Sequence, residues 1–416
     1  EGKVHTALTQ LVAKHKQLKT IFPSKKSQFI AAESTDIQFE IEIVTTSPLI
    51  ELASKINSCI KGISDSFDPD KGGLFKAVII KTGDKHNQLL LVSHHLVIDQ
   101  LSWQIILKDF IALCEDGTTS SMLSATYLEW ASMLETQSST KTVLNSIDYW
   151  KNEHLPITGK SIPAQYENST NVSITLPKED TVKLLNDINH VYNTNTQDIL
   201  LTALLLSFYK TNRQSEFVID LENHGRFPFF DEKVDLVETV GWFTAQFPVK
   251  LSFQGRDIGE NIKWVKEKLL KIPHNGLSYG LLKYSADPEI SRQFSLVASP
   301  EILFNFLGKA GGDTLDGDWK MRSLHTEQIS LQKGIKSHSM EFNLMVTDGQ
   351  LRVLLTYDRQ LHHQQQITNF LDSFIEQLQQ VIGHCINEKQ KQYTVSDFSA
   401  ANISQNDLDT LLKAIE

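Results

Sequence analysis

Two adjacent histidines and an aspartate are the first residues in this chain that could do chemistry. His94, His95 and Asp99 follow an apolar run and precede an amphipathic stretch. A histidine has the pKa and reach of a general base, and a nearby aspartate could orient it or fix the loop. The alternative is structural: Asp99 caps the helix that follows, and both histidines are ordinary core residues. The residue types alone leave both interpretations open.

Metal and thiol chemistry are disfavoured by the surrounding residues. No further His or Cys stands at ligand spacing near the two histidines, and neighbouring side chains on a strand point to opposite faces. Cys59, Cys114 and Cys385 lie far apart with no CxxC pair, so neither a disulfide framework nor a structural zinc site is predicted. We expect no metal site and a reducing, cytoplasmic setting.

The pattern His-His-x-x-x-Asp, followed here by Ser102 and Trp103, resembles a known signature. It is shared by the condensation and epimerization domains of nonribosomal peptide synthetases. The resemblance implies that the second histidine, His95, belongs to the active site, with His94 as its neighbour. It also implies that Asp99 is structural and pairs with an arginine. This motif does not choose between peptide-bond formation and epimerization.

Further blocks in the second half of the chain extend the resemblance and favour epimerization. Residues 220–226 resemble the Glu-x-His-Gly-Arg motif of epimerization domains, which implies that Glu222 is the second catalytic group, supported by His224 and Arg226. Residues 240–244 match a Val-Gly-Trp-Phe-Thr block that contains Trp242, and the blocks at 276–280 and 304–308, the latter with Asn305, are similar to further segments of these domains.

The chemistry of such a pair can be stated from first principles. Inverting an α-carbon removes a proton from one face and returns a proton to the other, which two positioned groups do more easily than one. Burial would raise the pKa of the Glu222 carboxyl, while His95 could stabilise the enolate oxygen. The alternative for Glu222 is a salt bridge to Arg226 without a catalytic role.

The elements that must position these residues mix helices and strands without strict alternation, which predicts an α+β fold. Helices are expected at 4–22, 48–63, 102–114, 124–137, 141–154, 178–192, 196–211, 363–386 and 407–415. Strands are expected at 37–44, 74–81, 88–93, 172–176, 216–222, around Phe247 and Phe304, and at 340–346 and 351–357. The nearly unbroken apolar run at 88–93 predicts a strand buried on both faces.

A breaker-rich segment at 155–170 predicts a boundary between two lobes, residues 1–160 and 161–416. The resemblance implies a V-shaped fold like that of chloramphenicol acetyltransferase, with the active site at the lobe interface. It further implies an aminoacyl or peptidyl thioester substrate on the 4'-phosphopantetheine arm of a carrier protein, with no bound cofactor. The expected partners are an upstream peptidyl carrier domain and a downstream condensation domain or module.

Composition excludes other classes of function. The 416 residues carry 50 acidic and 40 basic side chains, a net charge of -10, whereas nucleic-acid binding needs clustered Lys and Arg. Apolar stretches such as 199–208 fall short of the roughly 20 residues that span a bilayer. Residues 1–26 are charged throughout and lack a signal peptide's apolar core. We expect no nucleic-acid or membrane partner.

Two other functions stay open, and departures from the family pattern motivate one of them. Gln100, Phe227 and Phe306 stand where a Gly, an acidic residue and a Tyr are usual, which would suit a noncatalytic domain that only recruits carriers. A condensation domain, an acyl transferase, is the other alternative. The opening Pro-Ile-Gln block of these domains is also missing, so we expect the first strand to be trimmed away or supplied otherwise.

Overall fold

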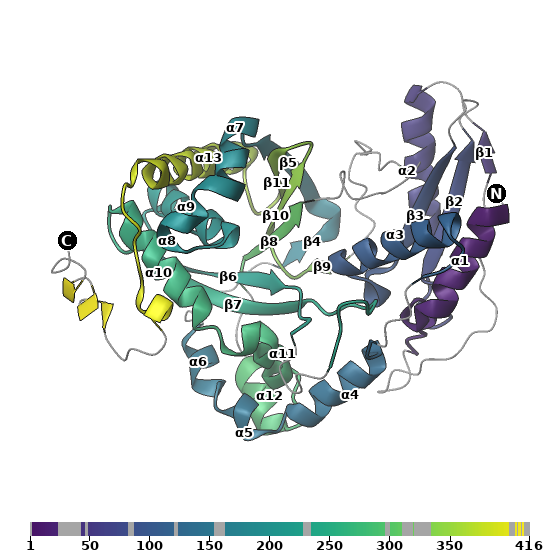
Figure 1. Cartoon of the computed structure of the whole chain (residues 1–416), viewed down its shortest axis with the longest axis horizontal. Helices are drawn as coiled ribbons and strands as arrows, with labels where there is room; N and C mark the ends of the chain where they lie inside the picture. Colours follow the sequence, from purple (N-terminus) through teal and green to yellow (C-terminus); the bar gives the residue numbers. More distant parts are fainter. Residues whose placement is uncertain are drawn as a thin grey trace. The chain divides into compact units, whose positions relative to one another are not determined.

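The computed structural model forms two compact units, each discontinuous in sequence (Figure 1). It describes residues 2–23, 43–45, 49–81, 87–119, 124–153, 163–227, 234–295, 300–309, 319, 334–398, 404–405, 407–408 and 410–411. Unit 1 comprises Glu1–Ser139, His224–Thr244 and Gly311–Lys333, and unit 2 comprises Thr140–Asn223, Ala245–Ala310 and Gly334–Glu416. These bounds differ from the lobes 1–160 and 161–416, and that division stays a prediction.

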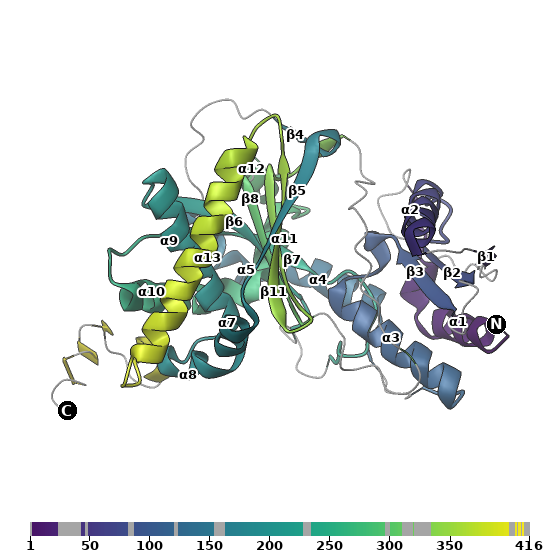
Figure 2. The same ribbon diagram turned by 90° about the horizontal axis from the view of Figure 1, so that it is seen from above.

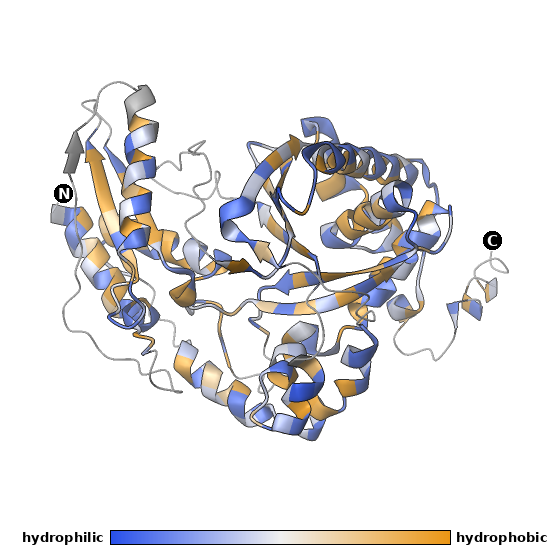
Figure 3. Cartoon of the chain, turned by 180° about the vertical axis from the view of Figure 1, so that it is seen from behind, coloured by the Kyte–Doolittle hydropathy of each residue, from blue (hydrophilic) through white to orange (hydrophobic). Residues whose placement is uncertain are grey.

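Unit 1 is built on a three-stranded sheet with helices on both faces. The strand order is β1 (Ile43–Thr45), β2 (Phe75–Lys81), β3 (Gln88–Ser93). Side chains alternate along a strand, so Phe75 and Ala77 join the core formed with α1 (Gly2–Lys14) and α3 (Gln100–Glu115), whereas Val78 and Ile80 pack with α2 (Leu49–Asp65). In Figure 3 the central strand of this sheet is largely in the hydrophobic colour.

The strand β3 is less buried than predicted. Its residues alternate between the two cores, but each keeps partial exposure. In the described sheet β3 pairs with β2 and stands at the edge. The predicted strand is present and has apolar contacts on both faces, but the prediction that both faces are fully buried was wrong.

Two other features complete unit 1. The 3-10 turn η2 (His95–Val97) connects β3 to α3, and η1 (Lys16–Lys19) follows α1, which ends at Lys14 and not near residue 22 as predicted. The helix α4 (Tyr127–Gln137) begins with a capping box in which Thr126 and Glu129 satisfy each other's backbone amides.

Unit 2 is built on a six-stranded sheet in the order β5 (Ser169–Thr175), β11 (Gln350–Asp358), β10 (Met340–Thr347), β8 (Ile302–Lys309), β6 (Glu216–Asn223), β7 (Ala245–Ser252). Helices α9 (Thr196–Asn212) and α13 (Gln364–Asn387) lie over one face of it (Figures 1 and 2). Phe342 on β10 contacts Phe370 and Phe374 on α13. The apolar alternation of the strands thus buries one face of the sheet.

The opposite face of this sheet carries polar side chains near the end of β6 and in the middle of β8. The two strands are parallel, with Asp220 opposite Leu303 and Leu221 opposite Phe304. Leu221 and Phe304 are fully buried, so by alternation Asp220, Glu222 and Asn305 project from the other side. This register is what brings Glu222 and Asn305 together.

The remaining helices of unit 2 are more broken than the sequence pattern predicted. Residues 141–154 form α5 (Lys141–Leu144) and α6 (Ile147–Asn152), and residues 178–192 form α7 (Lys178–Val182), a π turn at Lys183–Asp187 and α8 (Asn189–Tyr192). Helices α10 (Ile258–Leu270), α11 (Leu277–Lys283) and α12 (Pro288–Ser295) were not predicted. Short elements complete the unit: β4 (Ala164–Gln165), β9 (Ile335–Lys336), η3 (Tyr166–Asn168), η5 (Pro273–Gly276) and η6 (Val395–Phe398).

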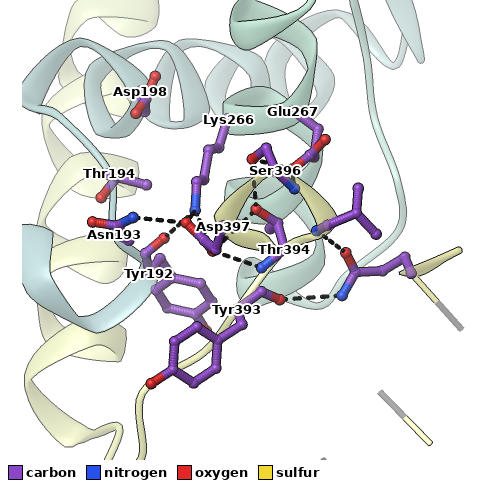
Figure 4. A network of polar contacts seen from close by, with 12 residues as sticks. Tyr192, Asn193, Thr194, Asp198, Lys266, Glu267, Tyr393, Thr394, Ser396 and Asp397 are labelled. Atoms are coloured by element: carbon purple, nitrogen blue, oxygen red, sulfur yellow. Dashed lines mark hydrogen bonds and ion pairs between the residues drawn. The ribbon is translucent and has the colours of Figure 1, made fainter. Parts of the chain in front are cut away.

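The segment after α13 is held to unit 2 by a buried ion pair (Figure 4). Lys266 on α10 contacts both carboxylate oxygens of Asp397 at 2.7 Å and also donates to the carbonyl of Tyr192. Asn193 donates to the same carboxylate, and the Thr394 amide donates to its other oxygen. The helix predicted at 407–415 falls mostly outside the described residues.

No helix in the described ranges is long and apolar enough to cross a membrane.

Candidate functional site

The His-His turn of unit 1 gives its two histidines different environments. His94 caps η2, with its Nδ1 accepting a hydrogen bond from the Leu96 amide at 3.2 Å, and its ring contacts Phe67 edge-on. Burial, and secondly the charge of His95, lowers the pKa of His94 below its ordinary value. His95 begins the 3-10 turn and its side chain is exposed. His94 therefore supports the turn, while the His95 side chain is the more exposed of the two.

Trp242 lies beside His95 in unit 1. The two ring centroids are 4.7 Å apart and the planes are inclined by 50°. Trp242 is 41% exposed, which is unusual for so large an apolar side chain. Trp103, by contrast, packs against Phe75 within the unit 1 core. Of the two tryptophans predicted near the site, only Trp242 is placed to line an accessible surface next to His95.

Asp99 lies at the centre of a buried network of hydrogen bonds. Its Oδ1 accepts from the amide and hydroxyl of Ser102, which makes it the N-cap of α3. Arg226 donates to Asp99 through both terminal nitrogens, at 2.5 and 2.9 Å, and the guanidinium lies 4.2 Å from the Phe243 ring centroid. Both charged side chains are at most 5% exposed. The predicted cap and the predicted pairing with an arginine are both present.

This network ties Arg226, Gly241 and Phe243 to α3 and its N-cap within unit 1. The Gly241 amide donates to the Ser102 hydroxyl at 3.1 Å, and Arg226 also donates to the Thr239 carbonyl. A Cβ on Gly241 would come within 2.3 Å of the Tyr127 ring, so only glycine allows this close approach. The Val-Gly-Trp-Phe-Thr block thus holds Trp242 at a fixed place beside His95.

The Glu-x-His-Gly-Arg motif is shared between the units. The chain leaves unit 2 after Asn223 and enters unit 1 at His224. His224 Nδ1 accepts a hydrogen bond from the Arg226 amide. Partial burial of the ring, with the charge of Arg226 second, lowers the pKa of His224. Arg226 contributes to the Asp99 network of unit 1, and Glu222 remains on β6 in unit 2.

In the part of unit 2 that the structure describes, the side chain that contacts Glu222 is an amide and not a cation. Asn305 Nδ2 donates to Glu222 Oε2 at 2.6 Å. Because Asn305 comes from β8 and Glu222 from the end of β6, the parallel pairing of these strands fixes their approach. The terminal nitrogens of Arg226 donate hydrogen bonds to Asp99, Ser102 and Thr239. These contacts do not support the alternative in which Glu222 is only the salt-bridge partner of Arg226.

The Glu222 carboxyl has an altered acidity. Burial is the main cause that raises its pKa to about 7, and the charges of Glu341 and Asp220 act in the same direction, whereas His338 opposes them. A carboxyl with a pKa near neutrality exchanges protons readily in both directions at physiological pH. Strongly shifted carboxyls of this kind are characteristic of acid–base sites.

Sequence reasoning missed the polar residues that surround Glu222. His338 Nε2 lies 2.8 Å from Asp220 Oδ2, and Gln246 Nε2 donates to the same oxygen at 2.8 Å. Lys336 and Glu341 form an ion pair at 3.3 Å. The position of Asp220, two residues before Glu222 on a strand, placed it on the same face and could have been noticed. His338 carried no comparable signal, because only the sheet brings it close.

The structure brings the predicted site residues into two sets. One is His94, His95, Asp99, Ser102, Trp103, His224, Arg226 and Trp242 in unit 1, and the other is Glu222 and Asn305 in unit 2. Among the described residues no three His, Cys, Asp or Glu side chains are grouped as a metal ion would need.

Comparison with known proteins places these features in a family. The family model described as "Condensation domain" matches residues 1–404. The chain is 31% identical over 426 residues to bacitracin synthase 3 of Bacillus licheniformis and 28% identical over 430 residues to tyrocidine synthase 2 of Brevibacillus parabrevis. These alignments cover 99% and 100% of this chain but only 7% and 12% of the two relatives.

Solved structures agree with this. The chain is similar to the crystal structure of the epimerization domain from the third module of tyrocidine synthetase B, with a TM-score of 0.84, 27% identity, and coverage of 93% of this chain and 90% of the other. The first condensation domain of the CDA synthetase matches with a TM-score of 0.61 at 15% identity over 92% of this chain and 87% of the other, which shows the fold alone. With an α+β fold of this type and a family model that matches nearly its whole length, the chain belongs to the condensation domain family.

Proposed function

We propose that this domain epimerizes the α-carbon of an aminoacyl or peptidyl thioester carried on the 4'-phosphopantetheine arm of a carrier protein. Glu222 transfers the α-proton, and His95 serves as the second group, stabilising the enolate oxygen or exchanging a proton. The thioester makes the α-proton more acidic than an amide or carboxylate would. The domain needs only positioned acid and base groups for this reaction.

The observation that carries the proposal is the state of Glu222. A carboxyl with a pKa of about 7 that accepts a hydrogen bond from Asn305, at the end of a strand, suits a group that takes up and returns protons. Its motif resembles that of epimerization domains, and the similarity to the epimerization domain from tyrocidine synthetase B supports the same subtype.

The alternatives are a condensation domain and a noncatalytic carrier-recruiting domain. The family is described as condensation domains, and the exposed His95 could equally position an attacking amine. Acyl transfer, however, gives no role to a half-neutral Glu222 carboxyl. In unit 1, Gln100 is an exposed residue in the first turn of α3, so its departure from the family pattern leaves the Asp99 network intact.

The test is to load a carrier protein with either the L- or the D-aminoacyl thioester and to incubate each with the domain. A catalyst changes rates and not the equilibrium, so both samples should approach the same mixture of configurations. Chiral analysis of the amino acid released by thioester cleavage measures this. The free amino acid, which lacks the arm that positions it, should keep its configuration.

Each alternative gives a different result in this test. A condensation domain would leave the configuration of both samples unchanged. It would form a peptide only when a second carrier-bound amino acid is supplied. A recruiting domain would bind the loaded carrier and change nothing. Retained configuration in both samples, with carrier binding demonstrated, would overturn the epimerization proposal.

A further inference from the structure

The backbone on both sides of Trp242 is fixed in unit 1 by hydrogen bonds to the start of α3. The Gly241 amide donates to the Ser102 hydroxyl at 3.1 Å. The Phe243 amide donates to Asp99 Oδ2 at 3.2 Å. Both acceptor side chains are buried, and hydrogen bonds are stronger where water is excluded. Trp242 therefore stands between two anchored residues.

A third hydrogen bond holds Trp242 itself. The hydroxyl of Tyr127, the first residue of α4, donates to the Trp242 carbonyl at 3.0 Å. The Tyr127 ring meets the Phe243 ring edge-on, with the centroids 5.1 Å apart. The position of the Trp242 backbone is thus set from both α3 and α4. Because the backbone is already ordered, the indole loses little further freedom when its ring makes a contact.

His95 has far less support of its own. Its side chain is exposed at the start of the short turn η2, and among the described residues neither of its ring nitrogens has a hydrogen-bond partner. Its ring contact there is Trp242, with the centroids 4.7 Å apart, a separation that aromatic pairs favour. Without such a contact an exposed side chain changes rotamer within picoseconds to nanoseconds.

We propose that Trp242 is a positioning residue that holds the His95 imidazole in one orientation, and that Tyr127 supports this role through the Trp242 carbonyl. The importance of that orientation for catalysis rests on the proposed function, in which His95 is the second group, but the restraint itself does not. A reacting group must be kept within a narrow range of distances and angles, and a displacement of about 1 Å can cost about a hundredfold in rate.

The experiment compares substitutions that remove the ring contact with substitutions that keep it. Trp242→Ala removes the indole, and Trp242→Phe keeps an aromatic ring at the same position. Tyr127→Phe removes the hydroxyl but keeps the ring that contacts Phe243. The matched control is Val237→Ala, because Val237 is a 70% exposed apolar side chain in the same segment of unit 1. Circular dichroism and thermal melting establish that each variant is folded.

The first readout is the mobility of the His95 ring, which needs no turnover. Carbon NMR relaxation of labelled histidine gives an order parameter for this ring, and the signal is assigned by its loss in His95→Gln. We expect an order parameter of about 0.8 in the parent and in Val237→Ala, and below about 0.6 in Trp242→Ala. Trp242→Phe should stay close to the parent. An unchanged order parameter in Trp242→Ala would overturn the inference.

The part of Tyr127 is tested by a double-variant cycle. Tyr127→Phe should make the His95 ring more mobile, but less so than Trp242→Ala does. Adding Tyr127→Phe to Trp242→Ala should cause no further change, because the hydroxyl acts on His95 only through Trp242. A His95 ring that is more mobile in the double variant than in Trp242→Ala would overturn the role assigned to Tyr127.

The rate of epimerization separates this inference from the proposed function. If both hold, Trp242→Ala should lower kcat by about 10- to 100-fold with little change in KM for the loaded carrier, and Trp242→Phe should restore most of the rate. A raised KM at unchanged kcat would mean that the indole only binds substrate or carrier, and would overturn the inference. If the His95 ring becomes mobile as expected but the parent never changes the configuration of a loaded substrate, the proposed function fails and the positioning of the ring stands.

Discussion

Glu222 is a residue whose ionisation opposes folding. Its pKa is about 7 in the folded chain, mainly because of burial, against an ordinary value of about 4.3 in an unfolded chain. A carboxyl with a raised pKa contributes its stability fully below its unfolded pKa, and the contribution is lost as pH rises through the folded value. The window in which this happens is therefore about pH 4.5 to 7.

We predict that Glu222→Gln raises the melting temperature at pH 8 and has little effect near pH 4.5. Glutamine resembles the neutral carboxyl that the folded state prefers, so the gain at pH 8 is at most about 3 kcal/mol, and less because the side chain is partly exposed. Glu216→Gln, at the exposed start of the same strand β6, is the control and should show no such pH dependence. A variant that melts lower than the parent at pH 8 would contradict the shifted acidity.

Asp99 belongs to folding more than to chemistry. We predict that Asp99→Ala destabilises the domain by about 3 to 5 kcal/mol, because it leaves the buried Arg226 guanidinium unpaired and removes the cap of α3. Asp116→Ala, an exposed position at the other end of α3, is the control and should change the free energy of unfolding by less than about 0.5 kcal/mol. Denaturant unfolding measures both. Native stability in Asp99→Ala together with lost activity would assign Asp99 a direct part in catalysis.

At the scale of elements, the glycines at the two ends of one family block differ. Gly276 has a φ of +90°, and a Cβ there would meet the Phe247 ring on β7 at 1.9 Å, whereas a Cβ on Gly280 within α11 meets nothing within 4 Å. We predict that Gly276→Ala costs several kcal/mol, at least about 2, through strain and displacement of Phe247. Gly280→Ala should be neutral or stabilising by up to about 1 kcal/mol. Equal melting temperatures in the two variants would refute this account of the junction between β7 and α11.

Local patterns predicted most elements, and their failures have physical reasons. The strand β6 and the helices α2, α3, α9 and α13 carry strong periodicity and were found close to their observed bounds. Residues 141–154 also look helical, but Asn145 and Ser146 interrupt them between α5 and α6. The strand β3 is apolar throughout, yet periodicity does not reveal that it stands at the edge of its described sheet.

The candidate site was predictable where chemistry follows local sequence. His95, Asp99 and Glu222 stand in recognisable motifs, and the cap formed by Asp99 follows from its place before a helix. The partnership of Asp220 with His338 joins residues that are 118 positions apart, and the pairing of Arg226 with Asp99 spans 127. The pairing of Asp99 with an arginine was predicted only from the family resemblance, because no local sequence pattern encodes contacts over such distances.

At the scale of the whole molecule, the contact units interleave along the chain. Residues 224–244 follow a strand of unit 2 but belong to unit 1. There Arg226 pairs with Asp99, Gly241 is hydrogen-bonded to Ser102, and the Trp242 carbonyl accepts from Tyr127. A boundary inferred from loop composition assumes that each domain is one continuous segment. Loop composition does not reveal that a segment leaves unit 2 and rejoins unit 1, as residues 224–244 do.

The C-terminal segment gives a prediction at this scale. Burial raises the pKa of Asp397, but Lys266, the Thr394 amide and Asn193 outweigh it, and the net pKa lies below the ordinary value. A depressed carboxyl contributes stability above its unfolded pKa of about 3.9 that is lost as pH falls through the still lower folded value. We predict that Asp397→Asn costs about 3 kcal/mol at neutral pH, because Lys266, 3% exposed, loses its counter-ion.

The control for this prediction is an exposed ion pair of the same unit. Glu376 pairs with Lys210 at 2.7 Å, but both side chains are about half exposed, so Glu376→Gln should cost less than about 1 kcal/mol. Denaturant unfolding at pH 7 and again near pH 3 compares the variants. If Asp397→Asn were no more destabilising than Glu376→Gln at pH 7, the buried pair would not be what holds residues 394–398 to α10.

The central claim is that Glu222 moves a proton on and off the α-carbon of a carrier-bound thioester, and heavy water tests it most directly. A carrier loaded with the L-aminoacyl thioester is incubated in heavy water with the parent domain, Glu222→Gln or Glu216→Gln, and the released amino acid is examined by mass spectrometry and chiral chromatography. We predict deuterium at the α-carbon with conversion toward the D form for the parent and Glu216→Gln, and a rate lower by about 10² to 10⁴ for Glu222→Gln. Retention of both the α-hydrogen and the L configuration with the parent domain, or an undiminished exchange rate in Glu222→Gln, would contradict the claim.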